Sequence, residues 1–144
     1  MKTERSIVNE NQRRAIGVAL ERLDEVLCAI ETWADGREAH GVLYAETNDL
    51  PASRREALRS RVEEMRRLLV EARDRLGLKP TEVRASGDVW SRCCAIRDTL
   101  SELDAKHMKG YGDMPPQLTR YMNDLSSRLV SALDRLSEEC KDDG

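Results

Sequence analysis

The chain has 144 residues, of which 40% are hydrophobic and 35% are charged, with a formal net charge of -3. This length and composition fit one globular domain and exclude the collagen-like, low-complexity and disordered classes. The near balance of 24 basic and 27 acidic residues provides no overall field that would attract nucleic acid or an anionic membrane.

Neither a membrane span nor a secretory signal is predicted. No stretch approaches the roughly 20 apolar residues that a spanning helix needs. The first dozen residues are mostly polar, and Ile7 and Val8 are too short a run for the apolar centre of a signal peptide. The four cysteines show no CxxC spacing, and the adjacent pair Cys93 and Cys94 is poorly placed for a disulfide. We therefore expect a cytoplasmic protein with reduced thiols.

Helical periodicity is the strongest signal in the chain. Apolar residues recur in alternating steps of four and three along four segments, and each of these seams is about 27 Å long in a helix. The seams are Ile16, Leu20, Leu23, Leu27, Ile30 and Ala34; Leu58, Val62, Met65, Leu69, Ala72 and Leu76; Val89, Cys93, Ile96, Leu100, Leu103 and His107; and Leu118, Met122, Leu125, Leu129, Ala132 and Leu136.

These seams predict helices over about 9–35, 53–76, 84–109 and 115–140. Helices of matched length with mostly short connections are typical of a bundle. The predicted fold is therefore all-α, a single domain over 1–144 that forms an antiparallel up-down-up-down four-helix bundle with a long loop between its first two helices.

Capping residues support these boundaries. Asn9 and Gln12 have the spacing of a capping box at the first helix, and Ser53 and Glu56 have the same spacing at the second. Gly77 is a typical helix C-terminus. For the third helix the sequence leaves three candidate caps open: Thr81, Ser86 and Asp88.

Charges on the first two helices predict how these helices pair. In an antiparallel pair aligned by the ends of the seams, Glu31 lies near Arg59 and Asp24 lies near Arg66. Exposed ion pairs of this kind contribute only about 0.2 to 1 kcal/mol, so they indicate orientation more than stability.

The connection over about 35–52 is longer than the roughly 2 to 8 residues usual between bundle helices. It contains apolar Val42, Leu43 and Leu50 among polar residues. One interpretation is that these apolar side chains cover one end of the bundle. The alternatives are a binding loop or a short extra helix.

In the predicted bundle this loop lies at the same end as the connection after the third helix. That end would gather both histidines and all three tyrosines, and we take it as the candidate interaction end. The competing interpretation is that its aromatic side chains only cap the core, with their polar tips in water. The candidate residues are Trp33, His40, Tyr44, Asp49, His107, Tyr111 and Tyr121.

Metal and catalytic signals are weak. Asp104 and His107 have the spacing of two ligands on one helix face, but the second such pair of a di-iron bundle is missing. Cys93 lies on a seam and is interpreted as a buried apolar residue. There is no glycine-rich phosphate loop. We therefore predict no metal site, no cofactor and no catalytic residue, and keep a metal or enzymatic site at the His40 and His107 end as a third hypothesis.

The second predicted helix is rich in arginine, which raises the alternative of nucleic-acid binding. Acidic residues on the same helix dilute this charge, and no aromatic residue interleaves it to stack a base. A salt-bridged, solvated helix is the simpler interpretation. The arginines that would contact phosphate in the alternative are Arg54, Arg55, Arg61 and Arg67.

The sequence thus predicts a small cytoplasmic interaction or regulatory protein that presents helix faces and one loop-rich end to another protein, with a homodimer as one arrangement. The alternative is a helical subunit of a nucleoprotein complex. The two differ in salt dependence, because phosphate contacts weaken steeply as salt rises.

Overall fold

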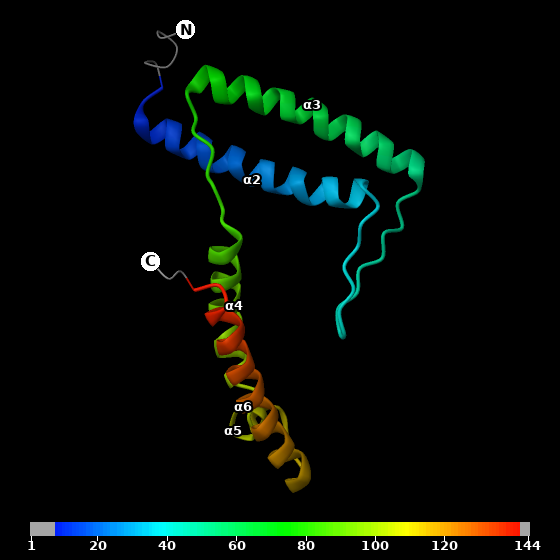
Figure 1. Ribbon diagram of the computed structural model, residues 1–144, viewed down its shortest axis with the longest axis vertical. Coiled ribbons are helices and arrows are strands. Elements are labelled where there is room, and N and C mark those ends of the chain that lie inside the picture. The colour runs from blue at the N-terminus through cyan, green and yellow to red at the C-terminus, as the bar shows by residue number, and fades with distance from the viewer. Residues whose placement is uncertain (1–7, 142–144) are drawn as a thin grey trace. The chain divides into compact units, whose positions relative to one another are not determined.

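The computed structural model describes residues 8–141. The described residues form five α-helices and one short 3-10 helix, so the all-α class predicted from the sequence is confirmed. The chain divides into two compact units, Met1–Thr81 and Glu82–Gly144. Each unit is built on a pair of neighbouring helices (Figure 1). The structure therefore establishes two helical hairpins, and it does not establish the predicted four-helix bundle.

The first unit pairs α2 (Glu10–Ala34) with α3 (Ala52–Leu76). The predicted capping box at the start of α2 is confirmed. Asn9 Oδ1 accepts a hydrogen bond from the main-chain N–H of Gln12 at 2.8 Å, and Gln12 Oε1 accepts one from that of Asn9 at 3.1 Å. These two bonds satisfy main-chain donors that the first turn of a helix leaves unpaired.

The ends of α3 differ in how well the sequence predicted them. At its start the expected Ser53 capping box is wrong, because Pro51 occupies the cap position and no side chain caps the helix. At its end Gly77 adopts a left-handed conformation with φ of 67°, as predicted, and the N–H of Leu78 donates to the carbonyl oxygen of Arg73 at 3.0 Å. This is the backbone pattern that glycine favours at a helix terminus.

Helices α2 and α3 run in opposite directions, but the predicted register between them is wrong. Arg66 pairs with Glu31 instead of Asp24. Arg59 lies 3.5 Å from Asp35 and donates to the carbonyl oxygen of Ala34 at 2.8 Å, instead of pairing with Glu31. Aligning the seam ends placed each arginine one to two turns too far from the loop.

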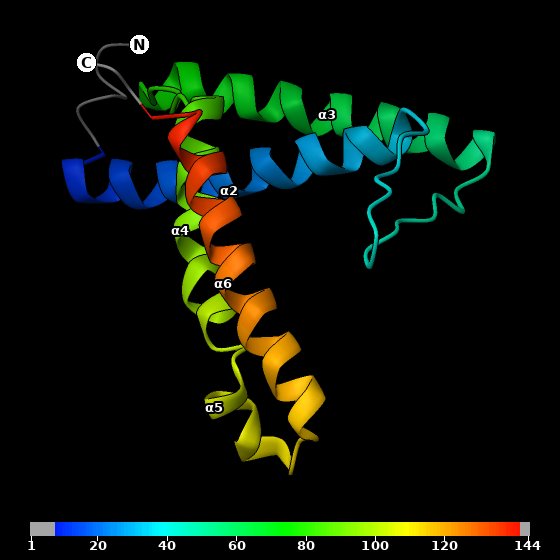
Figure 2. The same cartoon turned by 60° about the horizontal axis from the view of Figure 1, so that its bottom comes forward.

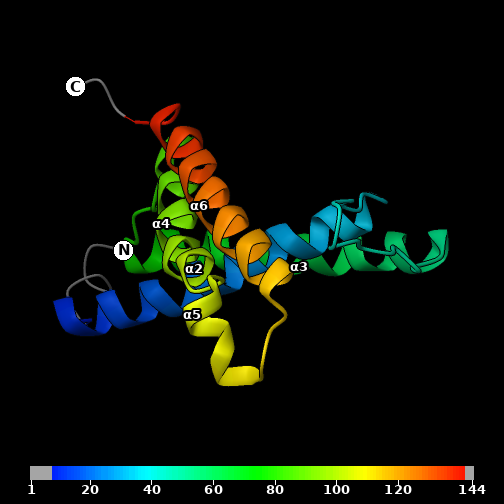
Figure 3. The same ribbon diagram turned by 90° about the horizontal axis from the view of Figure 1, so that it is seen from below.

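The second unit pairs α4 (Ala85–Ser101) with α6 (Pro116–Glu138), and their contacts show that they run in opposite directions. Arg97 Nε on α4 donates to Asp134 Oδ1 on α6 at 3.0 Å. Views from two further directions show the same pairing (Figures 2 and 3). The elements of this unit are α4 (Ala85–Ser101), α5 (Ala105–Met108), η1 (Lys109–Tyr111) and α6 (Pro116–Glu138).

The third helix does not continue over 84–109 as expected. α4 begins at Ala85 with Arg84 at the cap position, and it ends at Ser101. Asp104 then caps α5, because its side chain accepts a hydrogen bond from the main-chain N–H of His107 at 3.1 Å. A carboxylate that bonds locally to the backbone competes with helix continuation, so the chain starts a new helix here.

Few side chains are fully buried. Leu27, Ala34 and Val62 lie between α2 and α3. In the second unit the buried residues are small ones: Cys93, Ala105 and Ser126. Two paired helices cover only one side of each other, so much apolar surface stays outside.

Candidate functional site

The residues of the candidate interaction end are divided between the two units. Trp33, His40, Tyr44 and Asp49 belong to the first unit, whereas His107, Tyr111 and Tyr121 belong to the second. The prediction requires all four helices to form one bundle, and the structure describes two separate hairpins. We therefore describe the two groups separately.

In the first unit, the residues between α2 and α3 form a narrow loop that folds back on itself (Figure 1). We call residues 35–51 the hairpin loop. His40 and Ala45 form an antiparallel β-bridge. The N–H of Gly41 donates to the carbonyl oxygen of Tyr44 at 2.6 Å, and the N–H of Glu46 donates to that of Ala39 at 2.8 Å. The loop is thus ordered by its own backbone.

Two glutamates tie the arms of the hairpin loop together. Glu46 accepts hydrogen bonds from the N–H of Ala39 at 2.8 Å and from the Tyr44 hydroxyl at 2.5 Å. Glu38 accepts one from the N–H of Asn48 and lies 2.9 Å from His40 Nε2. These donors stabilise the ionised carboxylates. The Asn48 N–H therefore lowers the pKa of Glu38, and the Tyr44 hydroxyl lowers that of Glu46.

Asn48 fixes the base of the hairpin loop to the end of α2. Its side-chain amide donates to the carbonyl oxygen of Trp33 at 2.8 Å, and its Oδ1 accepts from the N–H of Leu50 at 3.2 Å. The last carbonyl groups of a helix have no partner within the helix, so this bond satisfies one of them.

The tip of the hairpin loop consists of Val42 and Leu43, and both side chains are fully exposed, at 100% and 101%. Within the first unit, these two side chains therefore do not cover the core. Leu50 alone among the three apolar loop residues is half-buried. Tyr44 is also exposed, at 63%. The loop presents its apolar side chains to solvent while its polar groups bond internally.

Sequence reasoning did not select Glu38, Glu46 or Asn48 as site residues. A usable signal was present, since the two glutamates stand on either side of a central His-Gly-Val-Leu-Tyr segment. Matched acceptors on the two arms of a hairpin can both reach main-chain donors of the opposite arm. This pattern has no helical period, and a search for helical seams passes over it.

In the second unit the Asp104 and His107 pair acts as a helix cap. His107 Nδ1 lies 2.5 Å from Asp104 Oδ1, and this contact lowers the pKa of Asp104. Tyr111 and Tyr121 are exposed at 89% and 58%, so neither tyrosine caps a core as the competing interpretation expected. Within residues 8–141 there is no group of three or more histidine, cysteine or acidic side chains that could hold a metal ion.

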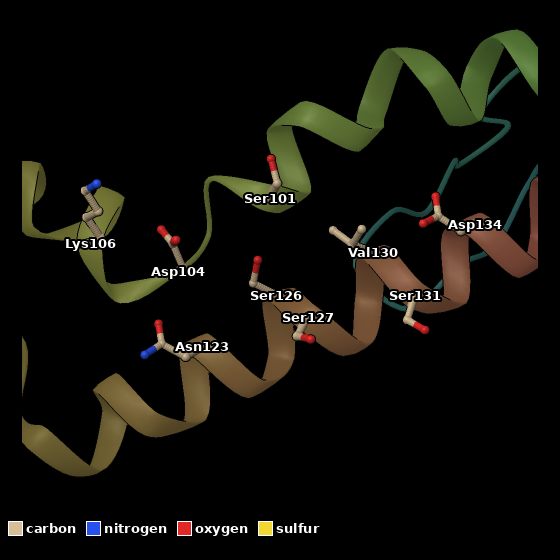
Figure 4. A pocket seen from close by; sticks show the side chains of 9 residues that line it. All are labelled: Ser101, Asp104, Lys106, Asn123, Ser126, Ser127, Val130, Ser131 and Asp134. Atoms are coloured by element: carbon tan, nitrogen blue, oxygen red, sulfur yellow. The ribbon is translucent and has the colours of Figure 1, made fainter.

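An open polar groove runs between the α4 and α6 sides of the second unit (Figure 4). Several of its polar atoms already have partners: Asn123 Oδ1 accepts from the N–H of Ala105 at 2.9 Å, and the Ser126 hydroxyl donates to the carbonyl oxygen of Leu100 at 2.8 Å. The groove thus has a structural role. Its lining residues are Ser101, Asp104, Lys106, Asn123, Ser126, Ser127, Val130, Ser131 and Asp134.

The four arginines that the nucleic-acid alternative requires differ in exposure and in pairing, so they do not form one exposed basic cluster. Arg55 is half-buried, and its Nη1 lies where a side chain on Gly36 would begin. Arg61 pairs with Glu64 at 3.1 Å. Arg54 and Arg67 are exposed, and no acidic side chain among the described residues pairs with them.

A comparison of this chain with protein-family models, with curated proteins and with solved structures finds no match. Among residues 8–141, no helix combines the length and the apolar character that crossing a membrane requires. The hairpin loop and its tip are therefore the most specific surface feature from which a function can be inferred.

Proposed function

We propose that this protein is a small interaction or regulatory module that inserts the tip of its hairpin loop into an apolar pocket of another protein. The observation that carries the proposal is the pair of fully exposed side chains, Val42 and Leu43, on a loop held by its own hydrogen bonds. The proposal includes no catalytic step.

The energetics support this role. Burying a valine or leucine side chain completely contributes roughly 1.5 to 3 kcal/mol, which is available only when a partner covers the tip. If the loop were mobile, part of this burial free energy would be lost in ordering its backbone on binding. Here Glu38, Glu46 and Asn48 order the loop before any partner arrives.

The test compares capture of partners by two full-length variants. Val42→Ser with Leu43→Ser removes the apolar tip, and Val18→Ser changes an equally apolar, half-exposed residue on α2 as a control. We expect a stoichiometric, nuclease-resistant partner from the native host to be captured by the parent chain and by the control. The tip variant should bind it at least about tenfold more weakly. Equal binding by the tip variant would overturn the proposal.

Cytoplasmic residence and the four-helix arrangement belong to the same proposal. The first is supported by the four cysteines, which are all free thiols in this structure. The second is supported by the two hairpins, because an antiparallel helix pair with one apolar side supplies half of a four-helix bundle, and the other half is a pair from the same chain or from a second copy.

A role in a nucleoprotein complex is a second candidate, supported only by exposed Arg54 and Arg67. Phosphate contacts release counterions, so this role requires binding that weakens steeply with salt and is lost after nuclease treatment. Substituting both arginines with glutamine should then weaken nucleic-acid binding. Binding to the hairpin-loop partner should not change, and this difference separates the two candidates.

A further inference from the structure

The most apolar side of α6 does not face α4. Residues along a helix turn by about 100° each, so side chains seven or eleven positions apart share one side. The side of α6 that packs on α4 is centred on Ser126, which is buried. The apolar residues lie about a quarter turn away from it and form what we call the α6 apolar face: Leu118, Tyr121, Leu125, Leu129, Ala132 and Leu136.

The α6 apolar face is largely in solvent. Leu118, Tyr121 and Leu136 are exposed at 44%, 58% and 54%. The fully buried side chains of the second unit are small, namely Cys93, Ala105 and Ser126, so Leu125 and Leu129 of this face are only half-buried and its other residues are exposed. A contiguous apolar surface of this kind on a soluble protein is typical of an interface.

We propose that the α6 apolar face is covered by the same face of a second copy of this chain, with the two α6 helices antiparallel about a twofold axis. The spacing of the face is self-complementary in this arrangement. With the axis midway between Leu125 and Leu129, Leu125 of one copy faces Leu129 of the other, and Leu118 faces Leu136. Tyr121 then lies level with position 133 of the other copy, one residue beyond Ala132.

Charged residues beside the α6 apolar face also favour a second copy of this chain as its partner. Asp124 and Arg128 lie on its outer edge, one turn apart, and pair at 3.5 Å within α6. About the proposed axis, Asp124 of each copy comes near Arg128 of the other, so four charges of alternating sign surround the centre. Such an arrangement is isologous, as a twofold interface requires, and it leaves no net charge. This inference is independent of the partner of the hairpin loop.

The first test measures the mass of the full chain across a concentration series by analytical ultracentrifugation at low salt. We expect a reversible dimer. Tyr121→Glu should leave a folded monomer, whereas Leu68→Glu, a change at a 62% exposed leucine of α3, should leave the dimer intact. Both positions are exposed, and circular dichroism verifies that each variant keeps its helices.

The second test identifies the twofold pairing through charge. Arg128→Glu places four negative charges about the axis, and Asp124→Arg places four positive ones. Each single variant should raise the dimer dissociation constant at least about tenfold, because like charges at an interface repel. Mixing the two single variants should restore a dimer, because both acidic side chains of one copy then face arginines of the other. Combining both substitutions in one chain should also restore it, because the charges then alternate in sign again.

A parent chain that stays monomeric at every concentration would overturn the proposal and indicate that the face is covered within one chain. A dimer that persists in Tyr121→Glu would overturn the assignment to this face. A dimer lost in Tyr121→Glu but not restored by mixing the two charge variants would overturn the antiparallel twofold pairing.

Discussion

The hydroxyl of Ser126 donates a hydrogen bond to the main-chain carbonyl oxygen of Leu100 at 2.8 Å, which joins the middle of α6 to the last turn of α4. Ser126 is buried at the centre of the helix contact. This bond places a small polar residue on the side of α6 that also carries half-buried Leu133, seven residues further on.

Replacing Ser126 with alanine should lower the free energy of unfolding of the second unit by roughly 0.5 to 1.5 kcal/mol, because the hydrogen bond is lost. Ser127→Ala changes an exposed neighbour and should have almost no effect. Denaturant titration followed by Trp90 fluorescence, in a Trp33→Phe background, reports on the second unit alone. Equal stability of the two alanine variants would show that the bond contributes nothing.

Gly36→Ala should destabilise the first unit by about 1 to 2 kcal/mol, because a side chain is strained at the positive φ of 78°. The new Cβ would also lie 2.3 Å from Arg55 Nη1, so the guanidinium must move. Gly87→Ala is the matched control: nothing lies within 4 Å of its Cβ, and alanine should stabilise α4 by up to about 1 kcal/mol. Trp33 and Trp90 report the two effects separately.

The hairpin loop should lose its order in acid. The pKa values of Glu38 and Glu46 are lowered in the folded loop, chiefly by the Asn48 N–H and the Tyr44 hydroxyl. Their contribution to loop stability is therefore complete above the ordinary value of 4.5 and is lost as the pH falls through the lowered values. Amide hydrogen exchange at Ala39 and Asn48 should accelerate, relative to the intrinsic rate, between neutral pH and about pH 3.

The same hydrogen-exchange experiment should also detect loss of loop order at alkaline pH, when Tyr44 ionises. The hydrogen bond to Glu46 raises the pKa of Tyr44, so the hydroxyl keeps its proton above its ordinary value of 10.0. Tyr44→Phe should therefore remove the alkaline transition of the loop and weaken its acid transition. If amide protection at acidic pH is the same in Tyr44→Phe as in the parent chain, the hydroxyl does not stabilise the Glu46 carboxylate.

A double-mutant cycle tests the register of α2 against α3. Arg66→Ala and Glu31→Ala should couple in the free energy of unfolding, and the coupling should shrink as salt rises. Arg66→Ala and Asp24→Ala, the pair expected from seam alignment, should be additive. Because Arg66 lowers the pKa of Glu31, Arg66→Ala should also raise that pKa toward 4.5, which carbon NMR measures directly. Coupling to Asp24 instead of Glu31 would contradict the observed register.

The helices were predictable because their apolar spacing is a local property. The boundaries of α2, α3 and α6 fall within one or two residues of expectation. The break after Ser101 was not foreseen, since the apolar seam continues through Leu103 to His107, whereas Asp104 caps a new helix through a local hydrogen bond. The predicted register was wrong for a different reason, because the register depends on which carbonyl and carboxylate groups Arg59 and Arg66 reach in three dimensions.

The assembly of the helices was less predictable than the helices themselves. The fourth seam has the pattern of a core, and the structure packs α6 on α4 through Ser126 beside that seam. A seam shows that a side of a helix must be covered, but it does not show by what. The candidate site depends on this point, because gathering His40 with His107 requires an arrangement of all four helices that no single seam specifies, and the two residues belong to different units.

At the turn of the hairpin loop, Val42 and Leu43 use ordinary backbone conformations, because only glycines have positive φ among the described residues. The hydrogen bonds that hold the loop end at Gly41 and Tyr44 and involve neither of their side chains. Almost any two residues could therefore replace this pair without strain on the fold. Selection for a new partner could therefore change the two tip residues while selection for stability maintains the arms of the hairpin loop. For the same reason, this position is suited to grafting a foreign recognition sequence.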